Sequence, residues 1–380
     1  MKLERLDTDD PRDVLRALRG AVLGAGPAIA LGPAAGLPQE VPAGTAVVLT
    51  TSGSTGVPKS VALSRSALTS SALATAARIG EGHWLLPLSG GYIAGVQVMV
   101  RALVAGRDPA ILAGRFSARA FAHAASGMHS TERGAAVPTY TSLVPAQLQT
   151  LVDAADDPDV LRALRSFETI LVGGQALPPA LRERAAERGA RIVRTYGSTE
   201  TSGGCVYDGV PLDGVRVAVV DGELRIAGPT LADGYAGDPE RTAAAFASDG
   251  DGTRWYRTGD AGSVEDGVVR VTGRIDNVIV SGGVNVSLDR VERVVHAVPG
   301  LEGAVVVGGP HARWGETPVL VLEGDGAPEL LAQARAAAER ELGAPARPDR
   351  IVALREIPRL DSGKPDRRAI TRAVARASQG

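Results

Sequence analysis

The sequence predicts an α/β protein with a large N-terminal domain, which includes a small β-rich subdomain, and a small α+β C-terminal domain. Up to about Asp221, apolar runs typical of buried strands alternate with helical stretches. Beyond it, short strands are separated by Gly-Asp turns, and a further change follows residues 273–276. A length of 380 residues favours two domains. We expect residues 1–275 to form the first domain and residues 276–380 the second.

The first elements place a polar glycine-containing segment after a buried strand. A helix is predicted over residues 11–23, and the Gly-, Pro- and Ala-rich stretch up to Gly44 is predicted to be a loop. A strand over 46–50 then leads into the segment 51–60, and residues 61–79 have helical character. Strand, glycine turn and helix in this order are typical of a phosphate-binding site.

The remaining elements follow from the same patterns of apolar residues. In the first domain, strands are predicted over residues 84–88, 169–172, 191–195, 215–220, 223–226 and 267–271, with a helix over 179–188. In the second domain, helices are predicted over 288–298 and 328–342, with strands over 303–307 and 319–322.

The composition excludes several classes of protein. Hydrophobic residues make up 44% and charged residues 22%, as in soluble globular proteins. The net charge of -2 offers no global attraction for nucleic acid. No stretch approaches the roughly 18 apolar residues of a membrane span. The charged N-terminus lacks the core of a signal peptide, so we expect a cytoplasmic protein. A single cysteine, Cys205, excludes an internal disulfide and a cysteine metal site.

Lysine occurs only at Lys2, Lys59 and Lys364, whereas arginine is abundant. Lys59 and Lys364 are therefore conspicuous, because a compact, rotatable ammonium differs from a planar guanidinium wherever reacting phosphates are approached. Lys59 ends a segment that is not the common phosphate loop, since Pro58 stands where that pattern requires its second glycine. Its hydroxyls and backbone amides suit phosphate oxygens. Taken alone, the segment fits a plain surface turn equally well.

Two acidic motifs follow in the first domain. Glu200, among the hydroxyl residues of 194–201, suits a magnesium ion that is shared with phosphates. A capping glutamate is the simpler interpretation of this motif by itself. Asp260, in the motif 255–260, could accept hydrogen bonds from ribose hydroxyls, although an ordinary Asx turn explains it as well.

The motifs 273–283 and 357–367 complete an ordered set of five. With them the sequence resembles the adenylate-forming superfamily, which includes acyl-CoA synthetases, peptide-synthetase adenylation domains and luciferases. The resemblance covers residues 46–368. It implies an adenylation domain that binds ATP and a carboxylic acid, followed by a mobile C-terminal lid domain. The activity implied is that of an AMP-forming acid–thiol ligase with ATP, Mg²⁺ and CoA.

The resemblance assigns roles to residues by their position in the motifs. The β- and γ-phosphates of ATP would be held by Thr51, Ser52, Gly53, Ser54, Thr55, Gly56 and Lys59. The adenine site would include Gly173, Gly174, Gln175, Tyr196 and Gly197. The catalytic residues would be Lys364 at the bridging oxygen, Thr199 at the α-phosphate and Glu200 as the Mg²⁺ ligand.

The same resemblance implies contacts outside the reacting phosphates. Asp260 would bind the ribose hydroxyls, and Arg274 would lie near ribose and phosphate. Asp276 would be the hinge between the domains. Gly282 and Gly283 would line the pantetheine tunnel of the second half-reaction.

Within the superfamily, the chain resembles most the short bacterial 2-succinylbenzoate CoA ligases of menaquinone biosynthesis, over residues 86–95 and 195–209. The small residues Ser202, Gly203 and Gly204 would leave room for an aryl ring beside the α-phosphate. Tyr92 is either the gate of the carboxylate tunnel or a packed core residue. The donor for a second substrate carboxylate stays unassigned.

Other functions remain open at this point. They are a CoA ligase or adenylating enzyme for another aryl or short-chain acid, and a nucleotide-binding regulatory protein on the same fold. Whether the chain forms a homodimer is also open. In an adenylating enzyme catalysis requires positioning and charge stabilisation rather than a side-chain nucleophile. We therefore expect Cys205 and all five histidines to be bystanders, namely His83, His123, His129, His296 and His311.

Overall fold

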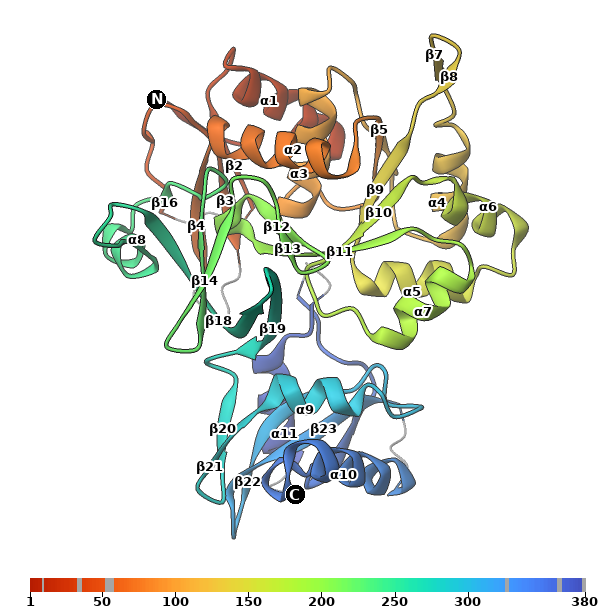
Figure 1. Ribbon diagram of the computed structural model, residues 1–380, viewed down its shortest axis with the longest axis vertical. Coiled ribbons are helices and arrows are strands. Elements are labelled where there is room, and N and C mark those ends of the chain that lie inside the picture. Colours follow the sequence, from red (N-terminus) through yellow and green to blue (C-terminus); the bar gives the residue numbers. More distant parts are fainter. Residues whose placement is uncertain (9, 33–35, 52–57, 325–327, 361–363, 378–380) are drawn as a thin grey trace.

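The computed structural model describes the chain except for residues 9, 33–35, 52–57, 325–327, 361–363 and 378–380. Three sheets and their helices form a large N-terminal part, and a further sheet with its own helices forms a smaller part below it (Figure 1). The predicted α/β fold class is thus confirmed. Among the described residues, no helix is both long enough and apolar enough to cross a membrane.

The first sheet has the strand order β1-β2-β3-β4-β16. The first three strands are parallel, and β3, β4 and β16 pair antiparallel. The strands are β1 (Leu3–Arg5), β2 (Ala28–Leu31), β3 (Thr45–Thr51), β4 (Lys59–Ser64) and β16 (Gly234–Tyr235). The prediction of a loop up to Gly44 is wrong for β2, which is buried along its whole length between two neighbouring strands.

The prediction of a helix over residues 61–79 is wrong at its beginning. Val61 and Leu63 are fully buried in β4, which forms a hairpin with β3. The helix α2 (Arg65–Ile79) starts after Ser64, whose hydroxyl accepts a hydrogen bond from the Ala67 amide at 3.2 Å. The segment that carries the expected phosphate loop therefore connects two strands and does not lead into a helix N-terminus.

The second sheet has the order β13-β12-β11-β10-β9-β5-β6, with a parallel part from β11 to β6. Its strands are β5 (His83–Leu86), β6 (Ala110–Ile111), β9 (Thr139–Leu143), β10 (Thr169–Val172), β11 (Ile192–Ser198), β12 (Gly203–Tyr207) and β13 (Val210–Pro211). Because parallel strands end at the same edge of a sheet, the segments after β10 and β11 meet there.

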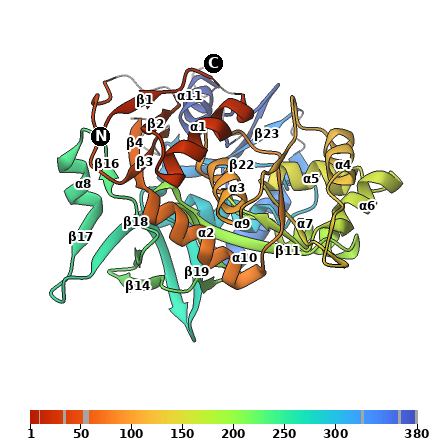
Figure 2. The ribbon, with the colours of Figure 1, turned by 90° about the horizontal axis from the view of Figure 1, so that it is seen from above.

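Helices cover both faces of this second sheet. One core cluster joins α1 (Pro11–Leu23), α2 and α3 (Ile93–Val104) to both sheets. The other cluster holds α4 (Ala118–Ser126), α5 (Pro145–Asp153), α6 (Pro158–Ser166) and α7 (Pro179–Glu187). Figure 2 shows α1–α3 between the strands β2–β4 on one side and α4–α7 on the other.

The helix α1 coincides with its prediction. Asp10 caps it by accepting from the Arg12 amide, Pro11 occupies the first turn, and Gly24 ends it with a left-handed φ of 83°. These three residues lie at the ends of the helix itself. The local sequence is therefore enough to determine where this helix begins and ends.

The β-rich subdomain has the strand order β14-β15-β18-β17, with β19 paired to β18. Its elements are β14 (Arg216–Val220), β15 (Glu223–Ala227), β17 (Phe246–Ser248), β18 (Arg254–Glu265), β19 (Val268–Arg274) and the short helix α8 (Pro239–Ala245). A separate small hairpin consists of β7 (Thr131–Glu132) and β8 (Ala135–Ala136). The β-rich texture predicted after Asp221 is therefore present, and it begins slightly earlier.

The C-terminal sheet has the order β21-β20-β23-β22, with β24 parallel to β23. Its strands are β20 (Val278–Ser281), β21 (Val284–Ser287), β22 (Val305–His311), β23 (Gly315–Glu323) and β24 (Arg350–Leu354). The helices α9 (Leu288–Val295) and α10 (Pro328–Leu342) cover one face, and α11 (Arg367–Ala377) covers the other. Only residues 275–277 separate β19 from β20.

Candidate active site

Segments from five places in the sequence converge at the carboxyl ends of β10 and β11. The turn 173–175 follows β10, and a single 3-10 turn, η1 (Thr199–Thr201), follows β11. Lys59 starts β4, Asp260 lies in β18, and Lys364 comes from the C-terminal part. With Arg274, which contacts Asp260, the fold therefore brings together residues from all five motifs at one edge of the second sheet.

Glu200 is a buried carboxylate with two polar neighbours. Its side chain is only 7% exposed. The Tyr235 hydroxyl donates to Oε1 at 2.9 Å, and Lys59 Nζ lies 3.4 Å from the same oxygen. Burial and the adjacent carboxylate raise the pKa of Tyr235, so its phenol stays a proton donor. Glu200 is consequently held in one orientation at the strand end.

Asp260 lies at the centre of a second polar cluster. The Tyr196 hydroxyl donates to its Oδ2 at 2.6 Å, and Arg274 Nη1 approaches its Oδ1 at 3.3 Å. Burial raises the pKa of Asp260, although Tyr196 and Arg274 oppose this shift. Arg274 also forms a two-pronged pair with Asp276, at 2.9 and 3.0 Å. This pair connects the expected ribose site directly to the expected hinge.

Lys364 reaches this site from the smaller part of the molecule. The segment between β24 and α11, dark blue in Figure 1, extends up to the large part near β11. The Leu360 amide donates to the Lys364 carbonyl and the Asp366 amide to the Pro358 carbonyl, both at 2.8 Å, so residues 358–360 and 364–366 lie side by side. A Cβ added to Gly174 would lie 4.0 Å from Lys364 Cε. Desolvation lowers the pKa of Lys364, and the carboxylates of Asp260 and Glu200 oppose it.

Glycines allow the backbone segments of the site to approach one another. A Cβ at Gly173 would collide with Thr195 Oγ1, and one at Gly197 would collide with the Gly203 carbonyl. Larger residues at either position would push the turn after β10 or the β11–β12 hairpin away from the strand ends. These glycines are thus required by packing, whether or not they also touch a nucleotide.

The expected acid pocket lies beside Glu200. Ser202 has a left-handed φ of 54°, and Thr201 Oγ1 donates to the Gly203 carbonyl at 2.7 Å. Gly203 faces helix α3, because a Cβ there would lie 3.2 Å from Gln97 Cγ. Tyr92 is the residue before α3 and is partly buried, and its side chain does not cap the helix. Its role as a gate stays a prediction.

Two polar residues of α3 were not predicted from the sequence. Gln97 is 1% exposed, and neither amide atom has a partner among the described residues. Arg101 lies one turn later, with Nη2 3.3 Å from the Tyr207 hydroxyl and its guanidinium 5.0 Å from the Trp84 ring centre. Within the described parts of the chain, no carboxylate pairs with Arg101, and burial lowers its pKa. The detectable signal was a lone charged residue in a mostly apolar helix.

Two further groups of predicted residues remain to be described. Ser52, Gly53, Ser54, Thr55 and Gly56 lie outside the described residues, although Thr51 and Lys59 pair directly at the ends of β3 and β4. Gly282 and Gly283 form the turn between β20 and β21. This hairpin points away from the large part of the molecule (Figure 1).

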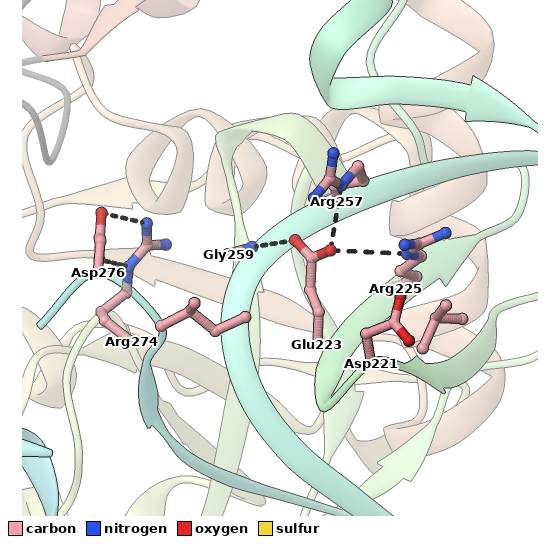
Figure 3. A pocket seen from close by; sticks show the side chains of 9 residues that line it. Asp221, Glu223, Arg225, Arg257, Gly259, Arg274 and Asp276 are labelled. Carbon is pink, nitrogen blue, oxygen red and sulfur yellow. Dashed lines mark hydrogen bonds and ion pairs between the residues drawn. The ribbon is translucent and has the colours of Figure 1, made fainter. Parts of the chain in front are cut away.

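A cavity of about 340 Å³ lies beside Asp276, the expected hinge residue (Figure 3). On one side it has the Arg274–Asp276 pair, and on the other Glu223 forms ion pairs with Arg257 at 3.1 Å and Arg225 at 3.6 Å. Glu223 also accepts a hydrogen bond from the Gly259 amide at 3.1 Å. Glu223 therefore supports the turn that carries Asp260, and the ion pairs around this cavity fit a structural role.

Comparisons with known families agree with this geometry. The AMP-binding enzyme family matches residues 6–236, and the C-terminal domain of AMP-binding enzymes matches residues 290–364. A probable 2-succinylbenzoate–CoA ligase of Mycobacterium tuberculosis is 39% identical over 89% of this chain and 86% of its own length. The 2-succinylbenzoate–CoA ligase of Enterococcus faecalis is 29% identical over 84% of this chain and 67% of its own.

Solved structures with a similar fold are also found among these enzymes. The o-succinylbenzoate CoA synthetase of Bacillus subtilis, in complex with the acyl-adenylate intermediate, has a TM-score of 0.72 at 25% identity, over 88% of this chain and 70% of its own. The amide bond synthetase McbA of Marinactinospora thermotolerans has a TM-score of 0.73 at 28% identity, and the match covers 92% of this chain and 76% of McbA. The predicted resemblance is confirmed, and the chain belongs to the family of AMP-binding enzymes.

Proposed function

We propose that the chain is an ATP-dependent 2-succinylbenzoate–CoA ligase that acts through an acyl-adenylate. The observation that carries the adenylation step is the position of Lys364, which extends from the smaller part of the molecule into the field of Glu200 and Asp260. An ammonium there can neutralise the charge that builds on the bridging oxygen as pyrophosphate leaves. The identity of the acid is supported by the relatives and by Arg101.

The nucleotide would be held by the residues that converge at β10 and β11. Thr51, Lys59 and the segment between them would bind the β- and γ-phosphates, and Thr199 the α-phosphate. The adenine would lie between Tyr196, Gly197 and the turn 173–175. Asp260 and Arg274 would bind the ribose, for which Asp260 would exchange its present hydrogen bonds with those of the sugar hydroxyls.

Glu200 is the proposed ligand of Mg²⁺. In the described part of the chain, no three His, Cys, Asp or Glu side chains gather as a metal site. One buried carboxylate nevertheless fits this ion, because Mg²⁺ commonly takes one or two carboxylates and completes its shell with phosphate oxygens and water. When bound, the ion would offset phosphate charge and lower the barrier to attack by another anion.

The first half-reaction then needs no protein nucleophile. A carboxylate oxygen of the acid forms a bond to the α-phosphorus, and the bond to the bridging oxygen breaks, which releases pyrophosphate. Cys205 supports this view, because burial raises the pKa of its thiol to about 12 and leaves it protonated. The task of the chain is to hold the two anions in line and to stabilise the leaving charge.

The second half-reaction requires a different arrangement of the two parts. We propose a domain boundary at residues 275–276, with Asp276 as the hinge, and a rotation that brings Gly282 and Gly283 to the site. The CoA thiolate would then attack the acyl carbonyl, and AMP would leave with the phosphate oxygen. The rotation acts as a gate that completes the tunnel.

Arg101 supports an acid with a second carboxylate. A buried guanidinium with no carboxylate partner in the described chain is costly, and an anionic substrate group would remove that cost. Its neighbour Gln97 is also buried, has no hydrogen-bond partner among the described residues, and lies next to the Gly203 position beside Glu200. Together they would bind the distal carboxylate and the adjacent oxygen of 2-succinylbenzoate.

A panel of acids tests this assignment. CoA-dependent AMP formation should be at least about tenfold faster with 2-succinylbenzoate than with benzoate or a medium-chain fatty acid. Replacement of Arg101 by Met should lower kcat/KM for 2-succinylbenzoate roughly 10- to 100-fold and leave the weak activity on benzoate unchanged. Equal turnover of benzoate by the unaltered chain would favour a ligase for another aryl acid.

A further inference from the structure

The contact between the two parts of the molecule is polar. Among the described residues, no hydrophobic cluster contains side chains from both the large part and the smaller part. Helix α9 lies directly below β19 (Figure 1), so the first helix of the smaller part faces the last strand of the large part. Without a shared apolar core, the orientation of the two parts depends on directional polar contacts, and such an interface can open and close.

Asp289, in the first turn of α9, accepts hydrogen bonds from both sides of the hinge. Its Oδ2 accepts from the Arg274 backbone amide at 2.7 Å, and its Oδ1 accepts from Asn277 Nδ2 at 2.6 Å. The side chain is 20% exposed, so the carboxylate is largely shielded from water. Hydrogen bonds to a carboxylate are stronger than those between neutral groups. One side chain therefore joins the end of β19 to the start of the smaller part.

Gly273 permits this close approach of α9 to β19. Its φ of 147° is a conformation that residues with a side chain rarely adopt. A Cβ at this position would lie 2.7 Å from Asp289 Cβ and 3.0 Å from its Oδ2. A larger residue would push the helix off the strand. Gly273 belongs to the motif 273–283, and this contact gives it a role that needs no nucleotide.

Arg293, one helical turn after Asp289, makes a second contact with the same strand. Its Nη2 donates to the carbonyls of Val271 and Thr272, at 3.1 and 3.2 Å. Residues four apart lie on one face of a helix, so Asp289 and Arg293 meet β19 side by side. One accepts from the strand and the other donates to it. Both contacts must therefore break when α9 leaves β19.

The same helix is connected to the segment that carries Lys364. Arg367, three residues after Lys364, forms a two-pronged pair with Glu292 of α9, at 2.8 and 2.9 Å. It also lies 3.6 Å from Asp289 Oδ1. These contacts lie within the smaller part and would survive a rotation about the hinge, whereas the contacts to β19 would not. The position of α9 on β19 therefore determines where the Lys364 segment lies against the large part.

We propose that α9 is a latch, in which Asp289 and Arg293 hold the smaller part in the arrangement that places Lys364 at the nucleotide site. The latch opens when the chain changes to thioester formation. Both residues act through Lys364 and are positioning residues. The inference rests on the proposed function, because a two-step ligase needs a second arrangement. The strength of the latch sets how the chain divides its time between the two half-reactions.

The kinetics of the two half-reactions test the latch. Asp289→Ala and Arg293→Ala should each make single-turnover thioester formation from preformed acyl-adenylate roughly 3- to 10-fold faster, because more of the chain adopts the second arrangement. Adenylate formation should stay unchanged or fall. Asp289→Asn keeps an acceptor oxygen, so its effect should be smaller. Arg290→Ala, at an exposed position of the same helix, should change neither step.

A merely structural role predicts a different result, since a damaged fold slows both half-reactions. Thioester formation that is unchanged or slower in both alanine variants would therefore overturn the proposal.

Hydrogen exchange, resolved at single amides, tests the latch without turnover. The Arg274 amide donates to Asp289, and Arg293→Ala leaves that hydrogen bond in place. Exchange of the Arg274 amide should nevertheless become roughly tenfold faster in this variant, because the two contacts open together. The Val306 amide, which donates to Glu292 at 2.8 Å within the smaller part, should keep its rate and report an intact fold. Arg290→Ala should change neither amide.

An Arg274 amide that exchanges at the same rate in Arg293→Ala as in the unaltered chain would overturn the latch. Faster exchange in a chain that forms no acyl-CoA would support the latch and count against the proposed function. The two proposals therefore fail by different measurements.

Discussion

The two ends of the C-terminal part differ in what surrounds them. At one end Lys364 lies against Gly174 and in the field of two carboxylates of the large part. At the other end, Gly282 contacts Trp314 of its own domain, and the β20–β21 turn to which it belongs points away from the large part of the molecule (Figure 1). With the roles proposed for these residues, this is the arrangement of adenylate formation. Thioester formation would then require that the two ends exchange places.

The largest expected effect is at the Lys364 end. Lys364→Ala should lower adenylate formation by a factor on the order of 100 to 1,000, because it removes a donor that stabilises the departing charge. Thioester formation from preformed acyl-adenylate should change little. Pyrophosphate release and single-turnover thioester formation measure the two steps. Lys2→Ala, at a lysine 73% exposed, is the matched control. Unchanged pyrophosphate release would remove Lys364 from the mechanism.

Substitution of Asp276, the proposed hinge, should affect thioester formation and spare adenylate formation, which is the reverse of the effect expected for Lys364→Ala. Asp276→Pro restricts backbone rotation between the two parts, so thioester formation should fall on the order of tenfold or more while adenylate formation is spared. Asp276→Ala serves as the control, because it also loses the pair with Arg274 and keeps backbone freedom. Equal loss of both half-reactions in the proline variant would mean that Asp276 supports the ribose site rather than the rotation.

Substitution of Glu200, like that of Lys364, should affect adenylate formation. Glu200→Gln should raise the Mg²⁺ concentration needed for half-maximal adenylate formation by about tenfold, since an amide is a weaker ligand than a carboxylate. Tyr235→Phe keeps the carboxylate and removes only its hydrogen bond, so its shift should be smaller. A magnesium titration that is identical in all three proteins would exclude Glu200 as the ligand.

The smallest effect is a difference in pH dependence. Because desolvation lowers the pKa of Lys364, the protonated form is lost at a lower pH than in an ordinary lysine. The rate of adenylate formation should therefore decline on the alkaline side before the pH at which free lysine titrates. This decline should be absent from Lys364→Ala. A profile that keeps the same alkaline limb in the variant would assign the titration to another group.

The sequence predicted local structure best where a motif coincides with a strand end. Residues 196–201 lie at the end of β11 and in η1, as the strand pattern indicated, and their roles stay predictions. Residues 59–64 were misassigned because buried Val61 and Leu63 fit a helix as well as a strand when the partner strand is unknown. Arg101 was missed because its burial depends on α2 and β12, which approach α3 only in the folded chain.

The β20–β21 end was predictable only in part. The motif 273–283 singled out Gly282 and Gly283. The cavity of about 270 Å³ beside them, in contrast, is formed by residues far apart in sequence, from Ser281 to Asp349. His311, expected to be a bystander, lines that cavity, and only the tertiary structure reveals it.

The exchange of the two ends can be measured directly with spin labels at Ala180→Cys in α7 and Val284→Cys in β21, both at exposed positions. The native Cys205 is buried and its pKa is raised, so it should stay unlabelled. With ATP alone, the distance between the labels should stay that of the free chain. A stable acyl-adenylate analogue with CoA should shorten it. A distance that does not change with CoA, in a chain that forms thioester, would contradict the rotation.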